Sequence, residues 1–524
     1  MNSMYVDVAI IGGGLAGNFL ARQLRRTLPH LTIGLFEKNK DTSFKVGEST
    51  VEIASNYMAR RLGLSTYLTE RQLPKNGLRF FFDRPDRQKS FTEMSEIGGV
   101  EFPYHPSFQL DRSRLESDLL AMNQEDGVEV HLGSQVKDLE LGAKTIRRER
   151  HRLSIQGDSH SWTATCRWLI DASGRHSLLA RKNQLRLQES QHHIAAVWGR
   201  CTGFADLDSW GPEKFRARIQ FTTRRLSTIH FCYSGYWIWI IPLGDNLTSV
   251  GVVGERSVFW NDTIRKMGGF LDFLKQHRAV WSLMESAKWL DIGSYHQLAY
   301  NTKQYFSEDG WGLTGEAASF TDPFYSPGSD FIALENDFLT HLIQREEQGD
   351  SPDHIRDLVS LLNRYMHYRF QANMRLYYGA YSSLGSYELL KLKWQLDFPL
   401  YYHLWFSHYL QDFHLDEGFL REQVEEQNNV LNALDNFSHL FRKVEQGLRR
   451  QQCYDRFNSG NFTNALEGIR WVKEVGLPQT PRQTLTRLGS IFNRTRQQAL
   501  EILGYPNSDA SMPISYFISP QQLV

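Results

Sequence analysis

The sequence has no net charge and very few cysteines. Lys and Arg together number 59, as do Asp and Glu, so the chain lacks the strong positive excess of a general nucleic-acid-binding protein. The four cysteines lie far apart and form no C-x-x-C pair, which argues against a zinc ribbon or a disulfide framework. We therefore expect no nucleic-acid partner and a reducing compartment, the cytoplasm.

Long apolar runs and metal-ligand patterns are also missing. No stretch of about 18 uncharged apolar residues is present, so no transmembrane segment is predicted. The first apolar run, residues 6–11, is shorter than the core of a signal peptide and follows no basic segment. The histidines show no H-E-x-x-H spacing, and no G-x-S-x-G motif is found. These absences argue against a metal site and a serine hydrolase.

What the sequence does contain is a βαβ pattern at its start. An apolar strand is predicted at 5–11, followed by Gly12-Gly-Gly-Leu-Ala-Gly17, a helix at 18–27 and a second strand at 31–36. This is G-x-G-x-x-G between strand and helix, and an acid, Glu37, stands 20 positions after the last glycine. The arrangement is typical of dinucleotide binding.

Each position in this pattern has a physical role. Gly12 permits the tight turn, Gly14 lets a pyrophosphate approach the backbone, and Gly17 allows close helix–strand packing. The helix N-terminus faces the phosphates, and Glu37 can accept hydrogen bonds from ribose hydroxyls. The predicted cofactor-binding residues of this unit are Gly12, Gly14, Leu15, Ala16, Gly17 and Glu37.

Three later segments indicate which dinucleotide is bound. Residues 111–120 read as a helix capped by Asp111, residues 168–175 as a strand entering a glycine turn, and residues 311–318 as another strand and turn. In this order the chain resembles the FAD-dependent aromatic monooxygenases, whose fold is like that of p-hydroxybenzoate hydroxylase. The resemblance implies an α/β (α+β overall) fold that binds FAD. It adds as cofactor-binding residues Arg112, Asp171, Gly315 and Glu316.

Two further motifs are similar to those of the flavin-dependent halogenases. They are Lys45-Val-Gly-Glu-Ser-Thr50, which adds Ser49 to the cofactor site, and W-x-W-x-I-P at 237–242. The resemblance covers roughly residues 5–340 and implies that Trp237, Trp239 and Pro242 line the region between flavin and substrate. Trp237 and Trp239 share one face of a strand, so a purely structural role in the core is the alternative.

The same resemblance implies that Lys75 is the catalytic residue. Lys75 lies four residues before Arg79-Phe80, as the family spacing requires, and Arg79 is the alternative. Without the resemblance, Lys75 would be read as a surface charge. In the family, reduced flavin, O2 and halide give hypohalous acid, which the lysine guides to an electron-rich ring, either by hydrogen bonding or as a haloamine. The haloamine route requires a lowered lysine pKa.

The loop 322–328 departs from the family pattern twice. Tyr325 occupies the place of a glutamate found in tryptophan halogenases, which favours a phenol or pyrrole substrate, either free or tethered to a carrier protein. The halide-binding positions correspond to Pro327 and Gly328, but proline has no N–H to donate. Halogenation with chloride or bromide and hydroxylation without halide therefore both remain open. No second dinucleotide unit is found, so a separate flavin reductase is expected to supply the reduced FAD.

The last third of the chain has a different character. We expect an FAD-binding monooxygenase-like domain at 1–345, with interleaved FAD and substrate sheets, and a helical region at 346–524. Residues 365–413 hold 15 aromatic side chains. These form either a helix–helix core or one of three functional surfaces: a substrate cap, a carrier-protein dock or a membrane-facing surface. Helices are predicted at 461–475 and 480–503, and a tail at 506–524.

Overall fold

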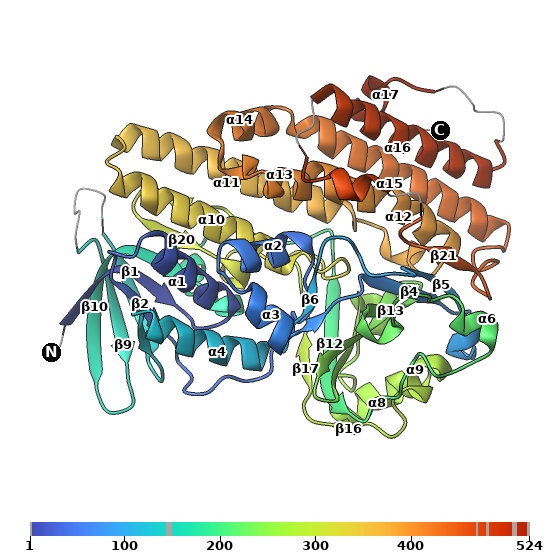
Figure 1. The fold of residues 1–524 in the computed structure, drawn as a ribbon, viewed down its shortest axis with the longest axis horizontal. Coiled ribbons are helices and arrows are strands. Elements are labelled where there is room, and N and C mark those ends of the chain that lie inside the picture. Colours follow the sequence, from blue (N-terminus) through green and yellow to red (C-terminus); the bar gives the residue numbers. More distant parts are fainter. Residues whose placement is uncertain (1–2, 143–148, 468–469, 478–480, 506–510, 521–524) are drawn as a thin grey trace.

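Two β-sheets and a layer of long helices across them make up the molecule (Figure 1). The computed structural model describes residues 3–142, 149–467, 470–477, 481–505 and 511–520. In Figure 1 the first sheet lies at the left, the second at the lower right, and the C-terminal helices run along the top. This mixed α/β architecture confirms the predicted fold class.

The first sheet is built around β1, which pairs in parallel with β2 and β10. Its eight strands include the path β19-β20-β10-β1-β2-β7, with the antiparallel β8 and β9 beside β10. The strands are β1 (Ser3–Ile11), β2 (Ile33–Phe36), β7 (Glu129–His131), β8 (Gln135–Leu141), β9 (His151–Gln156), β10 (Ser161–Asp171), β19 (Phe306–Ser307) and β20 (Trp311–Leu313). The predicted N-terminal βαβ unit is confirmed, because α1 (Leu15–Thr27) connects β1 to β2.

The second sheet has nine strands and carries the W-x-W-x-I-P motif on a central strand, β14. The strand order is β16-β12-β15-β14-β13-β4-β5-β21, and β17 also pairs with β12. The strands are β4 (Leu78–Phe82), β5 (Ser95–Gly98), β12 (Ile194–Thr202), β13 (Thr228–Tyr233), β14 (Tyr236–Gly244), β15 (Leu247–Glu255), β16 (Lys288–Trp289), β17 (Gly293–Tyr295) and β21 (Phe462–Asn464). The short strands β3 (Leu73–Pro74) and β6 (Phe108–Gln109) pair with each other, as do β11 (Arg186–Gln188) and β18 (Tyr300–Thr302).

One group of helices surrounds the sheets, and a second group forms the upper layer. The first group contains α2 (Glu52–Arg60), α3 (Ser65–Arg71), α4 (Arg112–Glu125), α5 (Leu178–Lys182), α6 (Glu213–Arg216), α7 (Arg256–Phe259), α8 (Met267–Lys275) and α9 (Arg278–Ser282). The upper layer holds α10 (Gly328–Glu347), α11 (Pro352–Arg375), α12 (Tyr387–Tyr401), α13 (Ser407–Leu410), α14 (Glu417–Glu425), α15 (Gln427–Arg450), α16 (Pro481–Ile502) and α17 (Ile514–Ile518). As predicted, the Asp111 side chain caps α4 by accepting from the N–H groups of Ser113 and Arg114.

The helical layer shares a core with the first sheet. One hydrophobic cluster runs from Val8 of β1 through Leu339 of α10 to Phe437 of α15. The long amphipathic helices bury their apolar stripes against this sheet and against one another. None of the helices within the described residues has the length and apolarity needed to cross a bilayer. The division of the chain at residue 345 stays a prediction.

Two sequence predictions for the C-terminal region are wrong. The helix expected at 461–475 is replaced by β21, which pairs in parallel with β5, and by a short 3₁₀ turn at 470–474. Asn458 holds this segment against the sheet, because its side-chain amide donates to the carbonyl oxygens of Asp83 and Gly385. The expected tail contains α17, where Phe517 is fully buried. Residues 506–510 and 521–524 of that tail lie outside the described residues.

A buried ion cluster fixes the edge of the second sheet beside β5. The Glu96 carboxylate accepts hydrogen bonds from Arg79, Arg218 and Arg224, and all four side chains are buried. Burial alone would raise the pKa of Glu96, but the neighbouring guanidinium groups of Arg79 and Arg224 lower it below its ordinary value. Arg79, the alternative to Lys75 as the catalytic residue, therefore belongs to a structural ion cluster.

Replacement of this carboxylate should destabilise the fold. We expect Glu96→Gln to lower the free energy of unfolding by about 3–5 kcal/mol, because the arginines lose their counter-charge inside the protein. Urea denaturation followed by circular dichroism measures the change. The exposed Glu285→Gln serves as the control and should alter stability by less than about 0.5 kcal/mol. A loss below about 1 kcal/mol for Glu96→Gln would contradict this account.

Candidate active site

The glycine motif lines a cavity at the carboxyl end of the first sheet. This dinucleotide cavity is bounded by Gly12, Gly14, Leu15 and Ala16, and it extends to Glu37. Gly12 has a φ of 106°, and a Cβ there would lie 2.5 Å from the Ala172 carbonyl oxygen. A side chain at Gly17 would come within 2.0 Å of the Gly12 carbonyl oxygen. Both positions therefore require glycine, and the backbone forms an open cradle suited to a pyrophosphate.

Glu37 directly follows β2 and lines the dinucleotide cavity. Its carboxylate accepts one hydrogen bond from the Gly13 N–H, at 2.8 Å, and one from the Asn39 N–H, at 2.9 Å. The side chain therefore has a fixed orientation at the cavity wall. Each carboxylate oxygen can accept a further hydrogen bond, so a ribose hydroxyl fits here, as the sequence predicts.

Arg112, Gly315 and Glu316 lie where the dinucleotide cavity meets a second cavity. Arg112 and Glu316 line both, and Gly315 lines the second. Glu316 forms an ion pair with Arg175, whose guanidinium nitrogen lies 3.1 Å from the carboxylate. Asp171 lines neither cavity. Its buried carboxylate accepts from the N–H groups of Ser173 and Leu179, so it shapes the adjacent turn instead of facing a cofactor.

The second cavity, here called the tryptophan cavity, contains both indoles of the W-x-W-x-I-P motif. Trp237 and Trp239 are almost fully buried, and they line the cavity together with Ser49 and Gly328. Their rings lie 5.9 Å apart between centroids. Trp237 donates to the Tyr381 hydroxyl and Trp239 to the Ser249 hydroxyl. The two residues therefore belong to the hydrophobic core and to a cavity wall at the same time.

Pro242, at the far end of the motif, lines neither this cavity nor its neighbours. It pairs with Thr248 where the register between β14 and β15 shifts. This irregularity interrupts the regular pairing at the end of β14. The sequence motif therefore contributes its tryptophans to the cavity and its proline to the shape of the strand.

Lys75 stands between the tryptophan cavity and a third one, the lysine cavity. It lines the lysine cavity, and its ammonium group donates to the Ser49 hydroxyl, at 2.9 Å, and to the Thr50 carbonyl oxygen, at 2.7 Å. Ser49 lines the tryptophan cavity, so one hydrogen bond crosses the wall. Burial lowers the pKa of Lys75 to about 8, although Glu52 and Asp330 act in the opposite direction.

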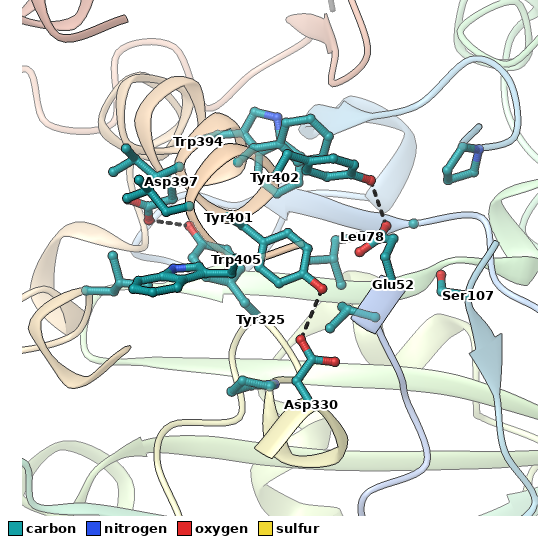
Figure 2. Close-up of a pocket in the computed structure, with 18 of the residues that line it drawn as sticks. Glu52, Leu78, Ser107, Tyr325, Asp330, Trp394, Asp397, Tyr401, Tyr402 and Trp405 are labelled. Carbon is teal, nitrogen blue, oxygen red and sulfur yellow. Dashed lines mark hydrogen bonds between the residues drawn. The ribbon is translucent and has the colours of Figure 1, made fainter. Parts of the chain in front are cut away.

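Two carboxylates, which the sequence did not single out, share the lysine cavity with Lys75. Glu52 accepts a hydrogen bond from the Tyr402 hydroxyl at 2.9 Å, and Asp330 accepts one from the Tyr401 hydroxyl at 3.0 Å (Figure 2). Burial raises the pKa of both carboxyl groups, that of Asp330 to about 7. The only sequence signal was their position, since both lie within a few residues of recognised motifs.

Tyr325 lies at the other side of the lysine cavity and contacts a third carboxylate. Its hydroxyl donates to Asp397 at 3.0 Å (Figure 2), and Lys393 forms an ion pair with the same carboxylate at 2.8 Å. Burial raises the pKa of Tyr325 well above its ordinary value, so it stays a neutral phenol. The chain thus has a carboxylate beside the position where tryptophan halogenases have a glutamate, but the carboxylate comes from α12.

The first turn of α10 carries the predicted halide positions. Pro327 precedes the helix and lines the lysine cavity, whereas Gly328 and Ser329 line the tryptophan cavity. The N–H groups in the first turn of a helix have no acceptor within that helix. Pro327 cannot contribute one. The two remaining amides and the positive end of the helix macrodipole favour an anion on the tryptophan side.

The aromatic-rich segment forms a large part of the lysine cavity. Pro399 lies inside α12 and supplies no N–H, and a π-helical turn at 402–406 follows it directly. Trp394, Tyr401, Tyr402 and Trp405 all line the cavity (Figure 2). This segment therefore contributes to the hydrophobic core and also lines a cavity. The substrate cap, the carrier-protein dock and the membrane-facing surface stay predictions.

The tight packing at Gly17 generates a prediction for cofactor retention. Gly17→Ala places a Cβ against the Gly12 carbonyl oxygen and forces the cradle to move. Overpacking of this kind costs about 1–3 kcal/mol. We therefore expect FAD affinity to fall by roughly one to two orders of magnitude. Flavin absorbance after desalting measures the bound fraction. Gly268→Ala, whose Cβ would meet no atom within 4 Å, should retain flavin normally, and equal retention by both variants would refute the packing argument.

Comparison with known proteins agrees with this geometry. Residues 5–246 match the family model for an FAD binding domain. The chain is 27% identical over 462 residues to the flavin-dependent halogenase chlA of Dictyostelium discoideum, covering 82% of this chain and 75% of chlA. It is 23% identical to a 1H-pyrrole-2-carbonyl-(peptidyl-carrier protein) chlorinase of Pseudomonas fluorescens, with 62% and 72% of the two chains covered.

A solved structure extends the likeness over nearly the whole chain. The structure of halogenase PltM in complex with phloroglucinol and FAD matches with a TM-score of 0.64 at 16% identity and covers 97% of this chain and 99% of that one. The fold that the two proteins share therefore includes the C-terminal helices of this chain. The predicted resemblance to the flavin-dependent halogenases is confirmed, the cofactor is FAD, and the protein is an FAD-dependent oxidoreductase.

Proposed function

We propose that this protein is a flavin-dependent halogenase that modifies an electron-rich aromatic ring. The observation that carries the proposal is the position of Lys75. A buried lysine of lowered pKa stands between the cavity that continues the FAD site and a cavity walled by aromatic side chains. Such a lysine can pass an oxidant from one side to the other while the two tryptophans keep the substrate off the flavin.

The dinucleotide and tryptophan cavities together hold the cofactor. Gly12, Gly14 and the start of α1 would cradle the pyrophosphate, with Glu37 at a ribose. The ring system would lie in the tryptophan cavity beside Ser49 and Gly315. There the bound FAD, once reduced, would supply the oxidant from O2. A chloride or bromide at the first turn of α10 would accept hydrogen bonds from the amides of Gly328 and Ser329.

Lys75 acts on the hypohalous acid formed next to it. The lone pair of the neutral amine attacks the halogen, a nitrogen–halogen bond forms, the oxygen–halogen bond breaks, and water leaves with the amine proton. The ring carbon then takes the halogen, the electron pair of the nitrogen–halogen bond returns to the Lys75 nitrogen, and that nitrogen takes a proton from the protonated carboxyl group of Glu52 or Asp330, whose pKa values are raised by burial. The ring carbon then releases its proton to the carboxylate so formed, which restores the aromatic ring, the neutral amine and the carboxylic acid.

The substrate that fits best is a phenol or pyrrole. Its ring is rich in electrons and needs no anionic group at Tyr325 to activate it. One similar protein is named for a pyrrole on a carrier protein, and the solved structure of another, halogenase PltM, contains the phenol phloroglucinol. Asp397 is placed to accept a hydrogen bond from the substrate hydroxyl or ring N–H. We further propose that the 346–524 region caps the substrate and that a separate reductase supplies the reduced flavin.

A second function, aromatic hydroxylation without halide, is favoured by one observation. Pro327 removes one of the backbone donors expected at the halide site. If the two amides at Gly328 and Ser329 do not suffice to hold a halide, the oxidant transfers oxygen to the ring. The same cavities serve both reactions, so the product distinguishes them.

Loss of Lys75 should abolish halogenation and spare the flavin chemistry. The turnover contains FAD, a flavin reductase, NADH, bromide or chloride, and a panel of phenols and pyrroles. For Lys75→Ala we expect normal FAD binding and NADH-driven oxygen consumption but at least about a hundredfold less halogenated product by mass spectrometry, as for loss of a nucleophile. Lys75→Arg, which keeps the positive charge but has no nucleophilic amine, should be equally inactive.

The controls separate the alternatives. Lys214→Ala, an exposed lysine on α6, should form product at the wild-type rate, and omission of the reductase should abolish product formation. Products that gain one oxygen and show no halogen isotope pattern would select the hydroxylase. Halogenated product from Lys75→Ala at the wild-type rate would remove Lys75 from the mechanism.

The pH dependence of halogenation tests which form of Lys75 acts. Burial lowers the Lys75 pKa to about 8, so the fraction of neutral amine increases as the pH rises through 8. We expect the halogenation rate to increase between pH 7 and pH 9 with a midpoint near 8, while flavin reoxidation, measured by absorbance in the same samples, varies without that step. A decrease across the same interval would show that the ammonium form acts by hydrogen bonding.

A further inference from the structure

Nearly every charged side chain buried along the lysine cavity already has a partner. Lys75 donates to Ser49 and Thr50, Glu52 accepts from Tyr402, and Asp330 accepts from Tyr401. Asp397 is paired with Lys393. These groups therefore have hydrogen-bond or ion-pair partners within the protein before any substrate arrives, as buried polar groups require. One cation in the cavity wall does not follow this rule.

The exception is Arg369 of α11. Its side chain lines the lysine cavity and is only 7% exposed. Its guanidinium lies over the Trp405 ring, with Cζ 3.8 Å from the ring centroid. It forms no hydrogen bond or ion pair with any of the residues that the structure describes. Stacking on an indole orients the guanidinium plane but satisfies none of its five N–H donors.

The next turn of the same helix adds a second unpartnered group. Asn373 lies four residues after Arg369, so the two side chains share one face of α11. Asn373 also lines the lysine cavity, and its buried side-chain oxygen has no hydrogen-bond partner in the described part of the chain. An amide can present its NH₂ or its oxygen to a ligand by rotating through 180°. The cavity thus contains a planar cationic donor and an adaptable amide side by side.

We infer that Arg369 pairs with a carboxylate carried by the substrate, which makes the substrate a free aromatic acid with a phenol or pyrrole ring. The inference rests on the proposed function, since it places that ring beside Lys75 in the same cavity. A carboxylate matches the planar guanidinium fork with two parallel hydrogen bonds. Asp330 interacts with Arg369 electrostatically but accepts no hydrogen bond from it, so the neutral thioester of a carrier-tethered ring would leave the guanidinium N–H groups without an anionic acceptor.

A binding experiment tests this without any turnover. The FAD-loaded protein, oxidised and in halide-free buffer, is titrated by calorimetry with hydroxybenzoates and pyrrole-2-carboxylate, and with the primary amide of each acid. Wild type should bind at least one acid, and bind it at least about tenfold more tightly than its amide, as expected for a charged hydrogen-bonded pair. Arg369→Gln should lose that preference, and Arg369→Lys should keep part of it.

The controls make each outcome informative. Arg364→Gln replaces an exposed arginine of the same helix and should bind like wild type. Flavin absorbance confirms that each variant retains FAD. Equal affinity for acid and amide in wild type, absence of binding by every acid, or tighter binding of phenyl phosphate than of any carboxylate would overturn the inference. None of these measurements requires halogenation, so a failure of the proposed reaction would not be confused with a failure of this pairing.

Discussion

The desolvation of Lys75 is the constraint on which the site depends. A primary amine is mostly protonated at neutral pH, and only burial makes its neutral form accessible. The protein achieves this burial by placing the amine between two cavities, where Ser49 and Thr50 satisfy two of its protons. Glu52 and Asp330 lie close enough to raise its pKa again, and the balance leaves that pKa at about 8. A closer ion pair with Glu52 or Asp330 would keep Lys75 protonated at neutral pH. A buried lysine without any polar partner would instead destabilise the folded protein.

The C-terminal helices complete this environment from above. Tyr401 and Tyr402 donate hydrogen bonds to the two carboxylates (Figure 2). Trp405 stacks against Arg369. The helical interruption at Pro399 and the π turn that follows set these side chains toward the cavity. The same segment buries Phe406 and Tyr409 in the cluster shared with the first sheet, and Tyr387 in the cluster shared with the second sheet. The same helices therefore contribute both to the hydrophobic core and to the wall of the lysine cavity.

The sequence predicted local patterns better than pairings between distant segments. The βαβ unit, the Asp111 cap and the tryptophan strand were predicted correctly, because each depends on a few adjacent residues. The helix expected at 461–475 is instead β21, because its pairing with β5 outweighs local helical preference. Asp171 shapes a turn, Pro242 lies at a strand irregularity, and Arg79 belongs to the Glu96 cluster. Spacing identified these positions, but it could not show where their side chains point.

The sequence by itself indicated a dinucleotide site, because a glycine turn specifies its backbone geometry through short-range sterics, and its resemblance to the flavin-dependent halogenases implied FAD and the class of chemistry. Only the tertiary structure decided which groups surround the reacting atoms. Glu52, Asp330, Arg369 and Asp397 come from segments up to about 345 residues apart, and none has a distinctive local pattern. Their importance depends on burial, because the same charged groups exposed to water would interact only weakly with one another and with a ligand.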